Sequence, residues 1–126
     1  MLLALLLALI HPAAVQTVAV DDASPPYAYH MYVRGRFDAF GYGGELRFTI
    51  TNGYVTGTYR PDTGGTLTTV HGGSQGSHIW FDIATLGGLH IDGTMQSNGA
   101  IKGMGSSTAG GKQWVFTATP LPVQSP

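Results

Sequence analysis

Two short segments in the middle of the sequence place histidine and aspartate at alternating positions. His78, Trp80 and Asp82 alternate with isoleucine and phenylalanine, and His90 and Asp92 alternate with leucine and isoleucine. In an extended strand, alternate side chains share one face. Pairing the two segments as a hairpin places Asp82 opposite His90, and the same register places Trp80 opposite Asp92. We therefore predict one surface cluster that contains all five residues.

This cluster is compatible with three interpretations. Two imidazoles and two carboxylates could hold a divalent metal, or a His-Asp pair could orient an imidazole as a general base. The third interpretation is a solvated face above a core of the intervening apolar residues, with an exposed Asp82-His90 pair worth about 0.2 to 1 kcal/mol. The sequence favours the solvated face as a binding surface, the identity of any metal stays open, and no cofactor is predicted.

Other polar motifs lack the partners that catalysis requires. His30 falls in the first predicted strand, and His71 falls in a glycine-rich loop before the fifth, without HExxH or CxxC spacing. The segment 72–76 lacks the helix and lysine of a phosphate-binding loop, and no serine stands in G-x-S-x-G. We predict no catalytic residue, with an enzyme built on His78, Asp82, His90 and Asp92 as the alternative.

The elements that position these residues are short strands. From Tyr27 onward, apolar residues recur with a period of two between glycine-rich breaks, and no window has a convincing helical period. Asn52-Gly53 and Asn98-Gly99 predict type I′ hairpin turns, in which both residues have positive φ. The eight predicted strands are Tyr29 to Phe40, Glu45 to Thr51, Tyr54 to Arg60, Thr66 to Val70, His78 to Ile83, Leu89 to Met95, Ala100 to Gly105 and Gln113 to Thr119.

The order of several motifs indicates an internal repeat. Phe37-Asp38 before Gly43-Gly44 recurs as Phe81-Asp82 before Gly87-Gly88, and Asn52-Gly53 before Gly57 recurs as Asn98-Gly99 before Gly103. We predict two copies of a four-strand unit, in which Asp38 and Asp82 flank equivalent turns. The fold class is therefore all-β, an up-and-down antiparallel barrel of about eight strands, with a two-sheet sandwich as the alternative.

Composition limits the partners. The chain has 126 residues, enough for one domain, and only 10% of them are charged, with a formal net charge of -1. The sequence has no basic stripe that could contact phosphates, so nucleic acid is not expected as a partner. The absence of cysteine excludes disulfides and cysteine-ligated zinc, and in a secreted domain it favours a bacterial source.

The N-terminal segment has the pattern of an export signal. The run from Met1 to Ile10 is entirely apolar and is followed by Pro12 and small residues. We predict that residues 1–23 are a signal peptide with a short leader, cleaved after Ala14, Ala19 or another small residue, and that residues 24–126 form the single domain. The protein is then secreted or periplasmic with no stable membrane span after processing, and a membrane anchor is the alternative.

A family resemblance accompanies this pattern. The segments that carry it are Gly35-Arg36-Phe37-Asp38, residues 46–50, residues 52–59, Gly72-Gly73 and residues 116–119. Together they resemble small exported bacterial β-barrel modules of lipocalin-like or avidin-like shape. The resemblance implies the fold alone, because the lipocalin Gly-x-Trp signature is absent and no biotin-contacting set can be matched. No site residue is carried over from these families.

These observations lead to a functional expectation. We expect a non-catalytic, exported binding or accessory module for a small molecule, a glycan or a protein partner. The binding residues we expect are His78, Trp80, Asp82, His90 and Asp92. A small barrel enzyme and a secreted interaction or inhibitor module that uses the proline-rich ends are the alternatives. An open barrel interior would favour a ligand carrier, whereas a filled one would move function to the outer face.

Overall fold

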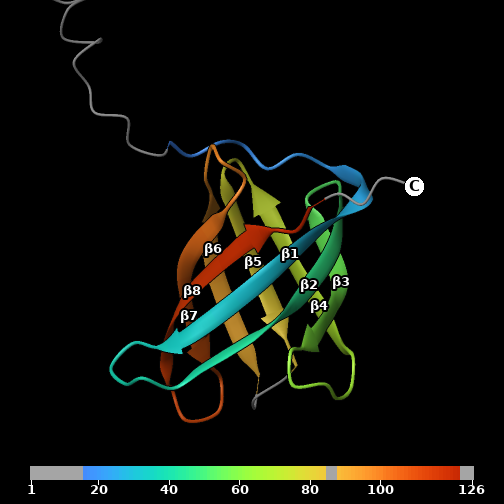
Figure 1. The fold of residues 1–126 in the computed structure, drawn as a ribbon. Helices are drawn as coiled ribbons and strands as arrows, with labels where there is room; N and C mark the ends of the chain where they lie inside the picture. The colour runs from blue at the N-terminus through green and yellow to red at the C-terminus, as the bar shows by residue number, and fades with distance from the viewer. Residues whose placement is uncertain (1–15, 85–87, 123–126) are drawn as a thin grey trace, which may run out of the picture.

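The protein is a closed β-barrel. The computed structural model describes residues 16–84 and 88–122, in which each strand pairs antiparallel with its sequence neighbours and β8 pairs with β1 (Figure 1). The predicted up-and-down barrel is confirmed, and the sandwich alternative is wrong because the strands form one continuous sheet. The strands are β1 (Ala23–Gly35), β2 (Gly41–Thr51), β3 (Tyr54–Pro61), β4 (Thr68–Gln75), β5 (His78–Ile83), β6 (Leu89–Met95), β7 (Ile101–Ser107) and β8 (Gln113–Pro120).

The described chain contains no helix, and therefore none long and apolar enough to cross a membrane.

Aromatic rings occupy the interior of the barrel. Phe48, Phe81 and Phe116 are at most 1% exposed. The Phe81 ring lies 5.1 Å from that of Phe48 and 6.2 Å from that of Phe116, and Tyr29 stacks on Phe48 at 5.7 Å. Eight strands enclose a space just wide enough for side chains to fill. The interior is thus a packed hydrophobic core.

Each of these phenylalanines has a glycine as its partner on an adjacent strand. The three pairs are Phe48–Gly57, Phe81–Gly72 and Phe116–Gly103. At Gly103, a Cβ atom would overlap the carbonyl oxygen of Asp92 and lie 2.7 Å from the Cα of Gly93. The glycines therefore allow neighbouring backbones to approach closely beside the large rings of the core.

The segment before β1 crosses one end of the barrel. The Val18 amide donates to the Met95 carbonyl at 2.9 Å, and the Val20 amide donates to the Gly76 carbonyl at 2.7 Å. Val20 also packs against the core. The boundary at residue 23 stays a prediction, and the proposed signal run Met1 to Ile10 lies outside the described residues.

The first predicted strand, Tyr29 to Phe40, is wrong at both ends, since β1 begins at Ala23. β1 stops at Gly35, and residues 36–40 form a loop that closes with a 2.7 Å hydrogen bond from the Gly35 amide to the Phe40 carbonyl. The Asp38 carboxylate accepts the Phe40 amide at 2.9 Å, which is the local bond by which aspartate competes with strand pairing. The alternation therefore continues in the sequence after the strand has ended.

The fourth strand also differs from its prediction. β4 runs from Thr68 to Gln75, so His71 and the glycines predicted in a loop are strand residues. Gly72 and Gly73 pair with Phe81 and Trp80, respectively, on β5. Glycine weakens a strand when considered alone. Here the backbone of β5 occupies the space that a side chain at Gly72 would need, and the Trp80 indole occupies the space at Gly73.

The two Asn-Gly turns are not identical, and neither are the two Phe-Asp pairs. Asn52 and Gly53 both have positive φ, as a type I′ turn requires, whereas at the second turn only Gly99 does. Phe37 lies in the 36–40 loop and is 83% exposed, whereas Phe81 is buried in β5. Asp38 and Asp82 therefore do not flank equivalent turns, and the duplication itself stays a prediction.

Replacing one inward glycine should show how tightly the strands pack. We expect Gly103→Ala to lower the free energy of unfolding by about 2 kcal/mol or more, because the new methyl group overlaps backbone on β6. Gly105→Ala, on the same strand, places its methyl 3.4 Å from the nearest atoms and should change stability by less than about 1 kcal/mol. Chemical denaturation of both variants measures the difference. Equal stabilities would contradict the role given to Gly103.

Candidate functional site

The predicted cluster forms on the outer face of β5 and β6. Asp82 pairs in register with His90, and Trp80 pairs with Asp92, as the sequence predicted. The residues between them, including Phe81 and Ile91, are fully buried. Strand alternation therefore places one apolar set in the core and the five polar residues outside.

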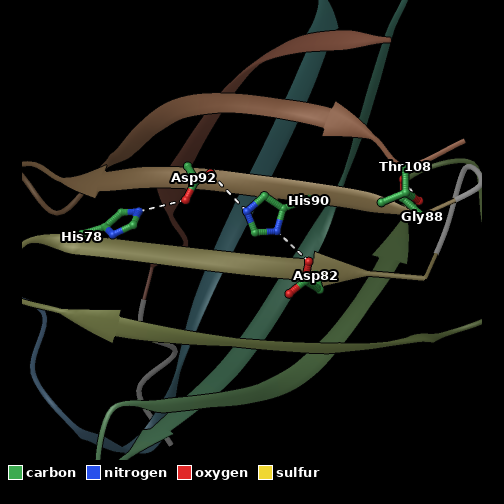
Figure 2. A network of polar contacts seen from close by, with 6 residues as sticks. All are labelled: His78, Asp82, Gly88, His90, Asp92 and Thr108. Atoms are coloured by element: carbon green, nitrogen blue, oxygen red, sulfur yellow. Dashed lines mark hydrogen bonds and ion pairs between the residues drawn. The ribbon is translucent and has the colours of Figure 1, made fainter. Parts of the chain in front are cut away.

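Hydrogen bonds join four of these residues into a chain that runs along the two strands (Figure 2). His78 Nε2 lies 2.9 Å from Asp92 Oδ1, and Asp92 Oδ2 lies 3.1 Å from His90 Nε2. His90 Nδ1 in turn lies 2.6 Å from Asp82 Oδ1. We call this arrangement the His-Asp ladder, and His90 is the only one of its histidines that bridges two carboxylates.

The ladder favours the protonated form of His90. The hydrogen bond to Asp82 is the main cause that raises the pKa of His90 above its ordinary value, and the negative charges of Asp82 and Asp92 add to it. Partial burial opposes the increase. An imidazole that donates to a carboxylate from each nitrogen carries both protons and a positive charge.

This state bears on the catalytic and metal interpretations. A doubly protonated imidazole has no free lone pair with which to accept a proton or bind a metal. Within residues 16–84 and 88–122, no three His, Cys, Asp or Glu side chains are grouped to hold a metal ion. The ladder thus presents carboxylate acceptors and imidazole donors side by side on the outer face of β5 and β6.

Trp80 lies against the sheet beside the ladder. A Cβ atom built on Gly73 would overlap the Trp80 indole, so the ring covers this glycine of β4. The centre of the His78 ring lies 5.0 Å from that of the Trp80 ring. The partly buried Trp80 is thus supported by β4 and keeps part of its surface open to solvent.

Tyr54 joins the site and was not predicted from the sequence. It pairs in register with Gly73, which pairs with Trp80, which pairs with Asp92. The Tyr54 side chain is 74% exposed, and glycine leaves the position between the two aromatic residues without a side chain. We call Tyr54, Gly73 and Trp80 the aromatic platform. The platform could have been predicted only from the register of β4 with its two neighbours, and the bounds of β4 were predicted incorrectly.

The remaining candidates from the sequence, His30, His71 and Asp38, fall into different surroundings. His71 lies on β4 opposite Asp82, and His30 bonds Asp62 at 2.7 Å through its Nε2. The Asp38 carboxylate forms an ion pair with Lys112 at 3.0 Å. The hydrogen bond that it accepts from the backbone N–H of Phe40 is the main cause that lowers the pKa of Asp38. Only His71 is therefore a direct cross-strand neighbour of the ladder, on the side of Asp82 away from His90.

Comparison with known proteins gives no family. The sequence matches no protein-family model and no curated protein.

The charge on His90 can be tested through Asp82. Because the folded pKa is raised, the ladder contributes stability below the ordinary histidine value of 6.5 and loses it as the pH rises through the folded pKa. Asp82→Asn should lower the His90 pKa, measured by NMR titration. It should also destabilise the fold more at about pH 6 than at about pH 9, by no more than about 1 kcal/mol for an exposed pair.

Asp62→Asn is the matched control, since Asp62 pairs with His30 and does not contact the ladder. It should leave the His90 titration unchanged. A His90 that titrates at or below its ordinary value in the unmodified protein would contradict the raised pKa.

Proposed function

We propose that this chain is an exported, non-catalytic binding module that holds a glycan on the outer face of the four neighbouring strands β3 to β6. The observation that carries the proposal is the aromatic platform, in which the Trp80 indole lies over Gly73 in the same row as an exposed Tyr54. Tryptophan and tyrosine are the residues that most often anchor binding surfaces. Here they adjoin the His-Asp ladder, so apolar and polar contacts meet.

The chemistry of a sugar ring fits this pairing. A pyranose has an apolar face of C–H groups, which packs on an aromatic ring, and a rim of hydroxyls that both donate and accept hydrogen bonds. The ladder offers both kinds of partner close to Trp80. The side chains of His78, Asp92 and Asp82 are 50%, 56% and 60% exposed, so each can reach a ligand while keeping its place in the ladder.

The filled interior supports an outer site. Phenylalanines and aliphatic side chains occupy the middle of the barrel, where a carrier protein would hold its ligand. Binding sites also need rigid support, and here each functional side chain stands on a paired strand. A ligand meets a preorganised surface and pays little entropy to order it.

Export, a lipocalin-like relationship and internal duplication belong to this proposal. Export rests on the apolar run from Met1 to Ile10. The closed barrel of eight strands supports a lipocalin-like shape. The duplication is supported by Gly57 and Gly103, since a Cβ at either would overlap a carbonyl oxygen of the preceding strand.

Glycan binding can be tested with the platform as the variable. We expect the protein to retain glycans from an array of neutral and acidic oligosaccharides, and ligand to change the fluorescence of the partly exposed Trp80. Trp80→Ala should weaken binding at least about tenfold, the loss expected for a hot-spot aromatic residue.

Tyr32→Ala is the matched control, since Tyr32 is a 45% exposed aromatic residue on β1, outside the platform. Its affinity should equal that of the unmodified protein. Retention of no glycan, or equal binding by Trp80→Ala, would contradict the proposal.

A second candidate function, a protein-interaction module, is favoured by one loop at the end of the barrel. Phe37 and Phe40 are 83% and 59% exposed on the β1–β2 loop, which lies at the same end as the β7–β8 loop (Figure 1). Arg36 lies 5.0 Å above the Phe37 ring, and Lys112 lies 5.3 Å from that of Phe40. A loop closed by hydrogen bonds thus presents two apolar rings to solvent.

This second candidate is tested by the double variant Phe37→Ser with Phe40→Ser. The variant should no longer capture a specific protein partner from envelope extracts. Its stability should be unchanged, because both rings are exposed in the free protein. Pull-down with mass spectrometry and thermal melting measure the two properties. The aromatic platform is untouched in this variant, so glycan retention should persist. Capture of the same partner by both proteins would remove this candidate.

A further inference from the structure

A hollow lies on the outer surface of the barrel, away from the His-Asp ladder. It has a volume of about 310 Å³ and is lined by Glu45, Arg47, Thr58, Arg60 and Leu67. These residues come from β2, β3 and the chain just before β4. The chain has only six lysines and arginines in total, and two of them meet here.

The charges in the hollow are unevenly paired. Glu45 is the register partner of Arg60, yet its carboxylate forms an ion pair with Arg47, two residues along its own strand. Within the described part of the chain, the Arg60 guanidinium forms no ion pair or side-chain hydrogen bond. The hollow therefore contains two positive charges and one negative charge. Of the two arginines, Arg47 is paired, and Arg60 has no side-chain partner among the described residues.

The register brings the two arginines close to each other. Arg47 pairs with Thr58, so Arg60 is its diagonal neighbour on β3, at a Cα separation of about 7 to 8 Å. Like charges at this separation repel unless an anion lies between them. Glu45 neutralises one charge and leaves room for a second anion beside Arg60.

We infer that this hollow is a binding site for an oxyanion, the carboxylate or phosphate group of a small ligand. Arg60 offers two parallel N–H donors, the geometry that binds a carboxylate or phosphate in a bidentate manner. The Thr58 hydroxyl supplies a further donor, and Leu67, which is 49% exposed, supplies an apolar wall for the rest of the ligand. Glu45 competes with the ligand for Arg47.

This site is separate from the proposed glycan surface. Tyr54 and Thr58 share the outer face of β3, and four residues of strand place them ~13 Å apart. The oxyanion site rests on the hollow and its arginines alone, so it stands whether or not the aromatic platform binds a sugar. An acidic oligosaccharide could contact both surfaces, which makes uronates useful probes.

The test follows the arginine Nε–H signals of the full chain by NMR during titration with sodium phosphate, digalacturonate or the neutral sugar maltose, at constant ionic strength. We expect phosphate, digalacturonate or both to shift the signals of Arg60 and Arg47, and maltose to leave them unchanged. Arg60→Gln should weaken binding about tenfold, through loss of a charge-assisted bidentate contact. Glu45→Gln should strengthen it about threefold or more, because it releases Arg47 and removes a negative charge.

Two controls separate this site from other effects. Arg34→Gln removes an exposed arginine on β1 and should leave the affinity unchanged, and Trp80→Ala should leave phosphate binding unchanged even if it abolishes glycan binding. A response to digalacturonate alone identifies a sugar carboxylate as the ligand group, and a response to phosphate alone identifies a phosphate. Equal affinity in Arg60→Gln, weaker binding in Glu45→Gln, or no shift with either anion at millimolar concentration would overturn the inference.

Discussion

The pairing of large aromatic rings with glycine across adjacent strands is the constraint on which this barrel depends. An interior enclosed by eight strands has little spare volume, and it holds Phe48, Phe81 and Phe116 near its middle. Each ring has a glycine opposite, and at these glycines even a methyl group would overlap neighbouring backbone. The same glycines are therefore needed for packing of the core and for close approach of the strands.

An aromatic ring also pairs with a glycine on the outer face of the barrel, at Trp80 and Gly73. Trp80 covers Gly73 as an aromatic side chain covers a glycine in designed sheets, which shields the exposed backbone. Because the strand alternates, Gly72 serves the core and Gly73 serves the outer face. Two adjacent glycines thus connect the packing of the interior with the shape of the aromatic platform.

The His-Asp ladder has more value as a charge arrangement than as a stabilising contact. Ion pairs this exposed contribute little to folding, because water solvates the separated charges almost as well. What the ladder fixes is direction, since Asp82 and Asp92 hold both nitrogens of His90 along the strands. A ligand would therefore meet groups that are already oriented.

Local patterns predicted β5 and β6 to the residue, together with the Asp82-His90 and Trp80-Asp92 pairs. In these strands buried residues alternate with outward-facing ones, so the period-two pattern also predicts which residues lie opposite each other. The bounds of β4 could not be predicted in this way, because the reason for Gly72 and Gly73 lies on β5. Tyr54 was missed for the same reason. The balance of charge in the hollow beside β2 and β3 depends on which of two arginines Glu45 binds, which the sequence does not show.

Closure of the sheet has a consequence for how the chain folds. β1 hydrogen-bonds to β8 along seven register pairs, from Tyr29–Pro120 to Gly35–Trp114, so the first strand finds one of its two neighbours at the far end of the sequence. Contacts of such long separation form slowly, since the entropy of closing the loop is lost before the contact stabilises anything. The barrel cannot close before β8 has been synthesised, because β8 supplies the second neighbour of β1.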